Sequence, residues 1–409
     1  MTESVDAQTT PLVPVTAPRD GTPPVITTRA GLTGAARALA TGTGPVAADA
    51  ERASGYRYGQ RTYLVQLRRE GVGTVLIDPI AVGELSEVDD ALSDAEWVLH
   101  AANQDLPGFH DLALHPSRLF DTELAARLLG RSKVGLGALI AEELGYSLAK
   151  EHSAADWSQR PLPEDWLRYA ALDVEFLVEL RDLLADALEE AGKLEWARQE
   201  FEAVRLAPPP PPRVDPWRRT SGMHVVRSPH GIAVVRELWH ARDELARTRD
   251  RSPGRVLPDR AIVAAAMALP RSERALVALP EFSGKGTRRS SAYWWAAVER
   301  ALALPADQLP PRRLAAGTGT PPPPRAWADK HPEAAARLEA VRATIRSLAE
   351  AHDLPQENLL APATQRQLAW TPPDVVDEAS VRTALEAQGA RPWQIELTLQ
   401  PLTTALRTS

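Results

Sequence analysis

Two proline runs limit how this chain of 409 residues can fold. The first lies in APPPPPR (Ala207–Arg213) and the second in GTGTPPPPR (Gly317–Arg325). Because proline lacks an amide hydrogen and fixes its φ angle, such runs end helices and strands and behave as semi-rigid spacers. The N-terminus is rich in Thr, Pro and Val without periodicity, which indicates disorder. We therefore predict a disordered tail (1–25), folded segments (26–205, 222–308 and 326–409) and two linkers (206–221 and 309–325).

The first folded segment alternates between strand and helix patterns. The expected strands lie at 45–51, 61–67, 73–79 and 96–102, and the expected helices at 85–95, 104–112, 122–129, 135–145 and 163–191. Strands followed by βα alternation are typical of an α/β domain with a mixed sheet. The two later segments show only a period of 3.6 residues, which predicts two small all-α helical bundles.

Acidic and basic residues are unevenly distributed between the two halves of the chain. Residues 1–200 contain 18 Lys and Arg against 32 Asp and Glu, whereas residues 201–409 contain 29 against 22, and 27 of those 29 basic residues are Arg. A GC-rich genome that replaces Lys by Arg would explain the arginines. An acidic half joined to a basic half also fits a metal-dependent active site beside a module that binds a polyanion.

The residue types that are missing exclude several kinds of site. The chain has no cysteine, which rules out disulfides, thiolate metal ligands and cysteine nucleophiles and agrees with a cytoplasmic location. Its nine histidines form no zinc-binding pattern. No apolar run approaches the length of a membrane span, and the N-terminus lacks the pattern of a secretory signal. We expect a cytoplasmic monomer with no membrane contact and no evident protein partner.

Two acidic residues stand in the predicted first, central strand, within VAADAER. Asp49 and Glu51 are two positions apart, so their side chains face the same side of the strand. Adjacent carboxylates on a buried strand raise each other's pKa and lose hydration, a conflict that a divalent cation resolves. They could also mark the exposed end of the strand.

Two further aspartates stand where strands give way to helices. Asp105, in LHAANQDLPGF, opens a predicted helix and could either bind a cation or complement the helix dipole. Asp121, in LFDTELAARLLG, occupies a similar position, and we interpret it as a helix cap.

The stretch RYAALDVEFLVEL (Arg168–Leu180) predicts a buried helix that carries a phenol and a carboxylate. Tyr169 and Asp173 are four residues apart, which places them on one helix face, one turn apart. A core tyrosine hydrogen-bonded to an aspartate is the structural alternative. Together with the strand pair and Asp105, however, Asp173 completes a set of four carboxylates that suits two hard cations, Mg²⁺ or Mn²⁺, across a phosphodiester.

These residues resemble the 3′–5′ exonucleases with an Asp-Glu-Asp-Asp metal site, in the subclass that uses Tyr, and more narrowly the bacterial ribonuclease D family. Asp49-Ala50-Glu51 matches the first family motif, LHAANQD with Asp105 the second, and Tyr169 to Asp173 the third. The intervening FDTELAARLLG, GLGALIAEELG and DWSQRPLPEDWLRYAALDV are similar to the same family. Residues 222–308 resemble an HRDC domain, and residues 326–409 resemble a weaker second copy.

The resemblance implies an RNase H-like sheet, two divalent cations and stepwise removal of 3′ nucleotides as 5′-monophosphates from RNA such as tRNA precursors. It also implies that Tyr169 orients the attacking water and that the cation ligands are four carboxylates, Asp49, Glu51, Asp105 and Asp173. Many relatives have a large apolar residue after the first-motif Glu, where this chain has Arg52. The same chemistry on DNA, and a nucleic-acid-binding adaptor with an inactive nuclease fold, are alternatives that the sequence leaves open.

Several arginines are candidates for contacts with RNA phosphates. Arg160, in SQRPL, precedes the active-site helix, although a bond to a backbone carbonyl would explain it equally well. Five more candidates lie near one end of a helix in the first helical bundle, where pairs with nearby acids are the structural alternative: Arg242, Arg247, Arg249, Arg251 and Arg255. Of the adjacent Trp294 and Trp295, we assign at least one to the core.

Overall fold

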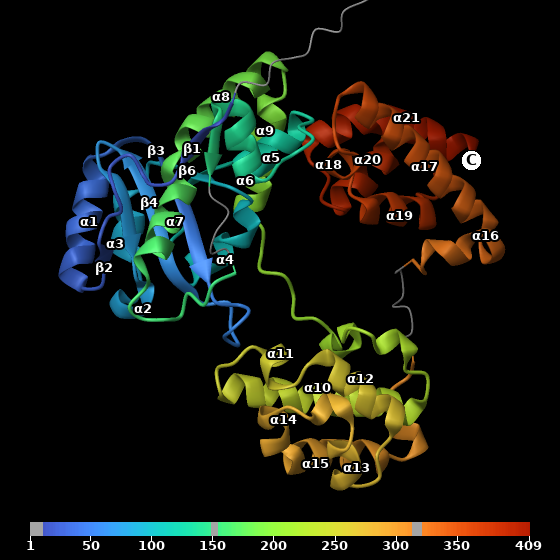
Figure 1. Ribbon diagram of the computed structural model, residues 1–409. Coiled ribbons are helices and arrows are strands. Elements are labelled where there is room, and N and C mark those ends of the chain that lie inside the picture. The colour runs from blue at the N-terminus through green and yellow to red at the C-terminus, as the bar shows by residue number, and fades with distance from the viewer. Residues whose placement is uncertain (1–10, 149–153, 313–320) are drawn as a thin grey trace, which may run out of the picture.

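The computed structural model describes residues 11–148, 154–312 and 321–409 (Figure 1). The first part of the predicted tail (1–10) and the middle of the predicted second linker (313–320) lie outside the described residues. Within the described ranges we find no helix that combines the length and the hydropathy needed to cross a membrane.

The N-terminal part is built on a mixed six-stranded sheet, as the sequence predicts. Its strands, in spatial order, are β2 (Val25–Ile26), β5 (Gly73–Ile77), β4 (Thr62–Glu70), β3 (Thr43–Arg52), β6 (Glu96–Leu99) and β7 (Arg118–Asp121). Strand β4 runs antiparallel to β3 and β5, and the other pairs are parallel. The strand that carries the Asp-x-Glu motif, β3, is therefore central, with two sheet neighbours that hold its backbone.

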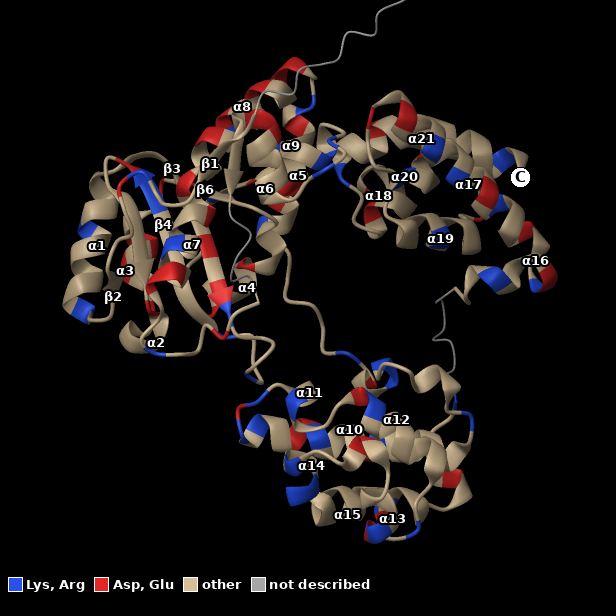
Figure 2. Cartoon of the chain, in the orientation of Figure 1, with Lys and Arg blue, Asp and Glu red and all other residues tan. Residues whose placement is uncertain are grey.

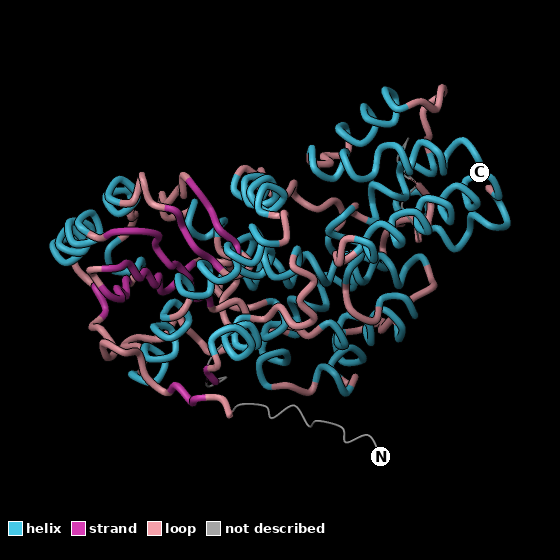
Figure 3. The backbone as a smooth tube through the Cα atoms, turned by 90° about the horizontal axis from the view of Figure 1, so that it is seen from above, coloured by secondary structure: helices cyan, strands magenta, loops and turns pink. Residues whose placement is uncertain are grey.

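Helices cover the sheet and extend from it, and Figure 3 shows the strands gathered at one end of the molecule. These helical elements are α1 (Arg29–Thr41), α2 (Pro79–Val82), α3 (Ser86–Ala91), η1 (Ala102–Gln104), α4 (Leu106–His110), α5 (Thr122–Leu128), α6 (Leu136–Leu139), the π-helical η2 (Ile140–Leu144), α7 (Glu164–Glu175), α8 (Leu177–Glu190) and α9 (Leu194–Arg205). The pattern did not predict α1 or α9. The expected helix over 163–191 is two helices, because the backbone of Phe176 leaves the helical conformation, with φ −110° and ψ 0°.

Part of the predicted disordered tail is ordered. Strand β1 (Val13–Val15) pairs in parallel with β8 (Tyr146–Leu148). Arg19 forms an ion pair with Glu179, and its guanidinium lies 4.9 Å from the ring centre of Phe176. The prediction of disorder is therefore wrong for residues 11–25, because partners far along the chain hold this segment in place.

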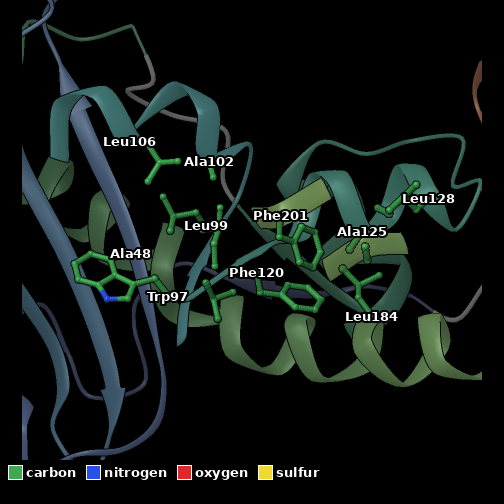
Figure 4. Packing of buried hydrophobic residues seen from close by; sticks show 14 of the residues in the cluster. Ala48, Trp97, Leu99, Ala102, Leu106, Phe120, Ala125, Leu128, Leu184 and Phe201 are labelled. Carbon is green, nitrogen blue, oxygen red and sulfur yellow. The ribbon is translucent and has the colours of Figure 1, made fainter. Parts of the chain in front are cut away.

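Apolar side chains from the sheet meet those of the later helices in one core (Figure 4). Trp97 and Leu99 on β6 and Phe120 on β7 are buried, and they are joined by Leu184 of α8 and Phe201 of α9. The Phe120 and Phe201 rings lie 4.7 Å apart. Burial of this much apolar surface is the main favourable contribution to folding and fixes the sheet against α8 and α9.

The second part is a helical bundle with its own core. It contains α10 (Pro229–Thr248), α11 (Pro253–Val256), α12 (Asp259–Ala268), α13 (Glu273–Val277), α14 (Lys285–Arg289), α15 (Ser291–Leu302) and the 3₁₀ segments η3 (Pro216–Arg219), η4 (Met223–Val225), η5 (Pro280–Phe282) and η6 (Ala306–Gln308). Trp294 is buried and donates its indole N–H to the carbonyl of Thr287, which confirms the expectation that one of the paired tryptophans is core. Trp217 is buried in the same core, so the predicted linker 206–221 ends earlier than expected.

The third part is also helical, as predicted. It contains η7 (Pro324–Ala326), α16 (Trp327–Lys330), α17 (Pro332–Ala351), α18 (Gln356–Leu359), α19 (Pro362–Trp370), α20 (Glu378–Ala387) and α21 (Pro392–Thr408). Its apolar core, around Ile345 of α17 and Leu402 of α21, is continuous with the core of the α/β part.

Candidate active site

All five residues predicted for the active site line one cavity of about 640 Å³ in the α/β part. The five are Asp49, Glu51, Asp105, Tyr169 and Asp173. They come from three places in the fold: β3, the turn after η1, and helix α7, which packs across β3, β4 and β5. The structure therefore brings together residues that are more than 100 positions apart in the sequence.

Three of the carboxylates form a compact group. One oxygen from each of Asp49, Glu51 and Asp173 lies within 4.8 Å of the others. Asp49 and Glu51 share a face of β3 because they are two residues apart, and Asp173 faces them from α7. The alternative that the strand pair merely marks an exposed end does not fit, since Glu51 is buried.

Asp105 lies in the same cavity but outside this compact group. It stands at the N-terminal boundary of α4, yet its side chain makes no capping hydrogen bond there. Instead one of its oxygens lies 3.3 Å from a guanidinium nitrogen of Arg52. The carboxylate is thus buried and directed into the cavity, which argues against the interpretation of Asp105 as a simple cap.

Asp121 is a cap, as predicted, and it also supports the backbone that leads to Asp105. It accepts hydrogen bonds from the amides of Glu123 and Leu124 in the first turn of α5. It also accepts from the amides of Ala101 and Ala102, at 3.0 and 2.8 Å. Ala101 has a φ of 58°, a conformation that costs free energy in a residue with a Cβ and so needs such support.

Burial raises the pKa of the four carboxylates Asp49, Glu51, Asp105 and Asp173. Burial is the main cause for Asp49, Glu51 and Asp173, and the pKa of Glu51 is raised further by the three neighbouring carboxylates. Burial together with the charge of Asp49 raises the pKa of Asp105 to about 8, although Arg52 acts in the opposite direction. Four clustered acids with one adjacent cation are an unfavourable arrangement that bound positive charge would relieve.

Tyr169 lies beside this group, and its hydroxyl is hydrogen-bonded to the Asp173 carboxylate. Burial and the neighbouring carboxylates raise the pKa of Tyr169 well above its ordinary value. The phenol therefore stays protonated at neutral pH and acts as a hydrogen-bond donor.

The donor set fits divalent metal cations. Oxygen-only carboxylate ligands are those that Mg²⁺ and Mn²⁺ prefer, and a cavity open beside them leaves room for water and for a substrate phosphate. Among the described residues that line the cavity, His100 is the one that offers an imidazole. Burial lowers the pKa of His100 to about 4, and its Nδ1 lies 2.9 Å from the hydroxyl of Thr122, so it is a neutral wall residue.

The structure corrects the prediction that Arg160 contacts RNA. Its guanidinium donates to both carboxylate oxygens of Asp78 and to the carbonyls of Tyr63, Trp157 and Gln159. All five donors of the guanidinium are thereby used within the protein. Arg160 holds a loop against the sheet and has no donor left for a phosphate.

The prediction for Arg242 is also wrong. This residue is buried in the helical bundle, where it donates to the carbonyl of Leu257 and forms an ion pair with Asp259 at 2.5 Å.

The other four arginines of this set, Arg247, Arg249, Arg251 and Arg255, are exposed. Figure 2 shows Lys and Arg gathered near the ends of α10, α11 and α14. Arg255 of the helical bundle donates a hydrogen bond to the carbonyl of Gly55 in the α/β part, so its side chain is engaged within the protein. Arg247, Arg249 and Arg251 therefore stay candidates for phosphate contacts.

Sequence reasoning missed several residues of the cavity wall, namely His100, Gln104 and Glu123, and it singled out Arg52 only through the family resemblance. His100 and Gln104 stand within the LHAANQD motif, so their closeness to Asp105 in the chain was an available signal. For Arg52 the resemblance is the available signal, whereas strand alternation alone directs it away from Glu51.

Comparisons with known proteins agree with this geometry. Residues 23–189 match a family described as 3′–5′ exonuclease, residues 232–298 match the HRDC domain, and residues 320–406 match a family described as the 3′ to 5′ exonuclease C-terminal domain. The predicted α/β exonuclease domain and HRDC domain are confirmed. The last segment is confirmed as helical, and its likeness to a second HRDC copy stays a prediction.

Solved structures resemble the whole chain. A protein from Bifidobacterium adolescentis is 37% identical, with a TM-score of 0.88 over 97% of this chain and 100% of that chain. Escherichia coli RNase D, described as an exoribonuclease involved in structured RNA processing, is 27% identical, with a TM-score of 0.67 over 94% of this chain and 98% of that chain.

Among curated proteins, the ribonuclease D of Gluconacetobacter diazotrophicus is 33% identical over 297 residues, which is 70% of this chain and 74% of that protein. Across eight ribonucleases D, the aligned part spans from 42% to 77% of the relative's own length. With this likeness over most of its length and with the carboxylates and the tyrosine gathered in one cavity, the chain belongs to the ribonuclease D family of 3′–5′ exonucleases.

Proposed function

We propose that this protein is a metal-dependent exoribonuclease that hydrolyses phosphodiester bonds from the 3′ end of RNA and releases 5′-mononucleotides. The observation that carries this proposal is the compact group of Asp49, Glu51 and Asp173, with Asp105 and Tyr169 in the same cavity. The family and its relatives support the same activity.

We assign the four carboxylates as the ligands of two divalent cations, Mg²⁺ or Mn²⁺. Bound cations would supply the positive charge that activates a water molecule and stabilises the departing oxygen of a phosphodiester. The protonated hydroxyl of Tyr169 holds the Asp173 carboxylate in place and orients the attacking water by a hydrogen bond. Asp121 fixes the turn that presents Asp105.

The proposed substrate is structured RNA, including tRNA precursors. The exposed Arg247, Arg249 and Arg251 of the HRDC domain give that domain cationic groups that can contact RNA phosphates without reading the sequence. We further propose that the protein acts as a monomer in the cytoplasm.

The assignment of Asp173 is tested by Asp173→Asn, with Asp186→Asn as the matched control. Asp186 is an exposed aspartate on the following helix, α8, so its substitution removes the same charge away from the cavity. Asp173→Asn is expected to lower turnover of a 3′-labelled RNA by roughly 100-fold or more, because a misplaced reacting group costs that much, while RNA binding stays near wild type. Turnover equal to that of Asp186→Asn would contradict the ligand assignment.

The choice of RNA over DNA is tested with matched oligonucleotides of one sequence. Only contacts to the 2′-hydroxyl of the terminal nucleotide distinguish the two substrates at this site. We expect faster hydrolysis of the RNA, and equal or faster hydrolysis of the DNA would support the DNA-directed alternative.

A further inference from the structure

Arg52 faces the active-site cavity although the alternation of a strand directs it elsewhere. It follows Glu51 directly on β3, and neighbouring strand residues point to opposite faces. The register with β4 explains the exception. Glu51 pairs with Leu64 and Arg52 with Thr62, so Tyr63 is an extra residue on β4 at this point. Such a bulge re-aims the adjacent side chains, and here it brings Arg52 into the wall of the cavity.

The guanidinium of Arg52 is bound to Asp105, which is the one of the four proposed ligands that stands outside the compact group. It donates to the backbone carbonyl of Gln104 and lies 3.3 Å from an oxygen of Asp105. The Asp105 side chain is only 8% exposed, whereas that of Arg52 is 24% exposed. The guanidinium is thus the nearer of the two to solvent, and it can leave the carboxylate without unfolding the wall.

We propose that Arg52 is an internal counter-ion that exchanges Asp105 for the substrate. In the absence of a cation it neutralises Asp105 and keeps it apart from Asp49, Glu51 and Asp173. The pairing of Asp105 with the guanidinium would weaken if Asp105 held a cation, because two positive charges on one carboxylate repel each other, and Arg52 would then be released. The released guanidinium then faces the same cavity, where it binds a phosphate of the 3′-terminal nucleotide through its planar fork of donors.

This inference rests on the proposed function, since it requires cations and RNA in the cavity. It assigns Arg52 as a substrate-binding residue that makes cation loading and RNA binding favour each other. Substitution of Arg52 should therefore have two opposite effects. Cation binding without RNA should become tighter, because a competitor for Asp105 is lost, and binding of the RNA 3′ end should become weaker. A residue with a merely structural role would not tighten cation binding.

The test is a Mn²⁺ titration of the full-length protein without RNA. The concentration of free Mn²⁺ is measured by electron paramagnetic resonance. The variants are Arg52→Met, Arg52→Lys, which retains the positive charge, and Arg61→Met, which removes an exposed arginine outside the cavity. Of the two bound Mn²⁺ ions, the more weakly bound one should have a dissociation constant about 5-fold or more lower in Arg52→Met than in wild type. Arg52→Lys should stay close to wild type, and Arg61→Met should not differ from it.

A second measurement is the Michaelis constant for a short RNA at saturating Mn²⁺. It should rise by about 5-fold or more in Arg52→Met, with a smaller change in kcat. Unchanged or weaker Mn²⁺ binding by Arg52→Met would overturn this inference while leaving the proposed function intact. Wild-type protein that binds no Mn²⁺ in the cavity would overturn both.

Discussion

The HRDC domain and the C-terminal helical domain are attached to the exonuclease domain in different ways. The C-terminal domain shares a continuous apolar core with it, and Trp393 stacks on Trp196 of α9 with ring centres 5.0 Å apart. The HRDC domain instead contacts, among the described residues, a loop of residues 53–61 that leaves β3 just after the proposed cation ligands, and the ring of Tyr58 in this loop packs against the HRDC core. The hydroxyl of Tyr58 lies 2.9 and 3.0 Å from the two oxygens of Asp243 in this contact.

This difference indicates different roles for the two domains. A buried aromatic interface with hydrogen-bonded polar groups contributes several kcal/mol and makes its two sides fold as one unit. A small contact made of two tyrosine rings and a few partly exposed hydrogen bonds contributes less to stability and can open more readily. The C-terminal domain is therefore part of the scaffold of the exonuclease domain, whereas the position of the HRDC domain can change and can be transmitted directly to the active-site strand.

The largest effect on stability is expected from a substitution in the interface between the C-terminal domain and the exonuclease domain. Trp393→Ala removes a buried ring that also donates its indole N–H to Glu200. Its cost in unfolding free energy should be about 3–5 kcal/mol. Because the core is continuous, hydrogen exchange should become faster in α9 as well as in α21. The control is Trp294→Ala, in the core of the HRDC domain, which should accelerate exchange in α15 and leave α9 unchanged. Equal protection of α9 in both variants would show that the C-terminal domain is no more integrated than the HRDC domain.

This comparison also explains which features the sequence could predict. The Asp-x-Glu and Tyr-x-x-x-Asp spacings report local geometry, and so the strand pair and the helix face appear in the structure as expected. The stacking of Trp196 on Trp393 depends on which helices meet, and each tryptophan alone is typical of an ordinary core residue. The same applies to β1, whose composition indicates disorder until its partner β8 is known.

Two arginines show a further limit of prediction from residue type. A guanidinium next to an active-site helix fits a phosphate contact. Arg160, however, donates all of its guanidinium hydrogen bonds to Asp78 and to backbone carbonyls. Arg52 is the opposite case, because it lines the cavity at a point where one extra residue on β4 breaks the regular pairing with β3. Neither hydrogen-bond partners nor bulges follow from local periodicity.

A smaller effect, dependent on pH, should distinguish the two interfaces. Glu200 is buried beneath the C-terminal domain, and burial raises its pKa above the ordinary value although Arg391 opposes this. A carboxyl whose pKa is raised by folding stabilises the protein fully below its unfolded-state pKa, about 4.5. That contribution is lost as the pH rises through the folded-state pKa.

The measurement is the unfolding free energy of wild type and Glu200→Gln between pH 4.5 and pH 7.5. Because glutamine does not ionise, Glu200→Gln should gain on the order of 1 kcal/mol relative to wild type as the pH rises over this range. Glu195→Gln, at an exposed position on the same helix, should show no such trend. If the difference in unfolding free energy between Glu200→Gln and wild type does not change with pH, the buried carboxylate is fully compensated by Arg391 and by the indole of Trp393.

The smallest change in stability should come from the HRDC contact. Tyr58→Phe removes only the hydroxyl that binds Asp243, and a partly exposed hydrogen bond contributes about 1 kcal/mol or less. Its structural consequence should be larger than its energy, because loop 53–61 is also held by the amide of Ser252 and by Arg255. Loss of one of these few contacts should therefore accelerate hydrogen exchange across the loop and at the end of α10.

Tyr56→Phe is the matched control for this last variant, since it removes a hydroxyl from the same loop and keeps the ring that lies 4.0 Å beneath the Arg255 guanidinium. If the HRDC domain acts on the active site through this loop, Tyr58→Phe should alter turnover of a structured RNA more than turnover of a dinucleotide, which is too short to reach both domains. Tyr56→Phe should alter neither. Indistinguishable exchange and turnover in the two variants would mean that the HRDC domain only tethers RNA, and that its contact with the β3 loop carries no information to the carboxylates.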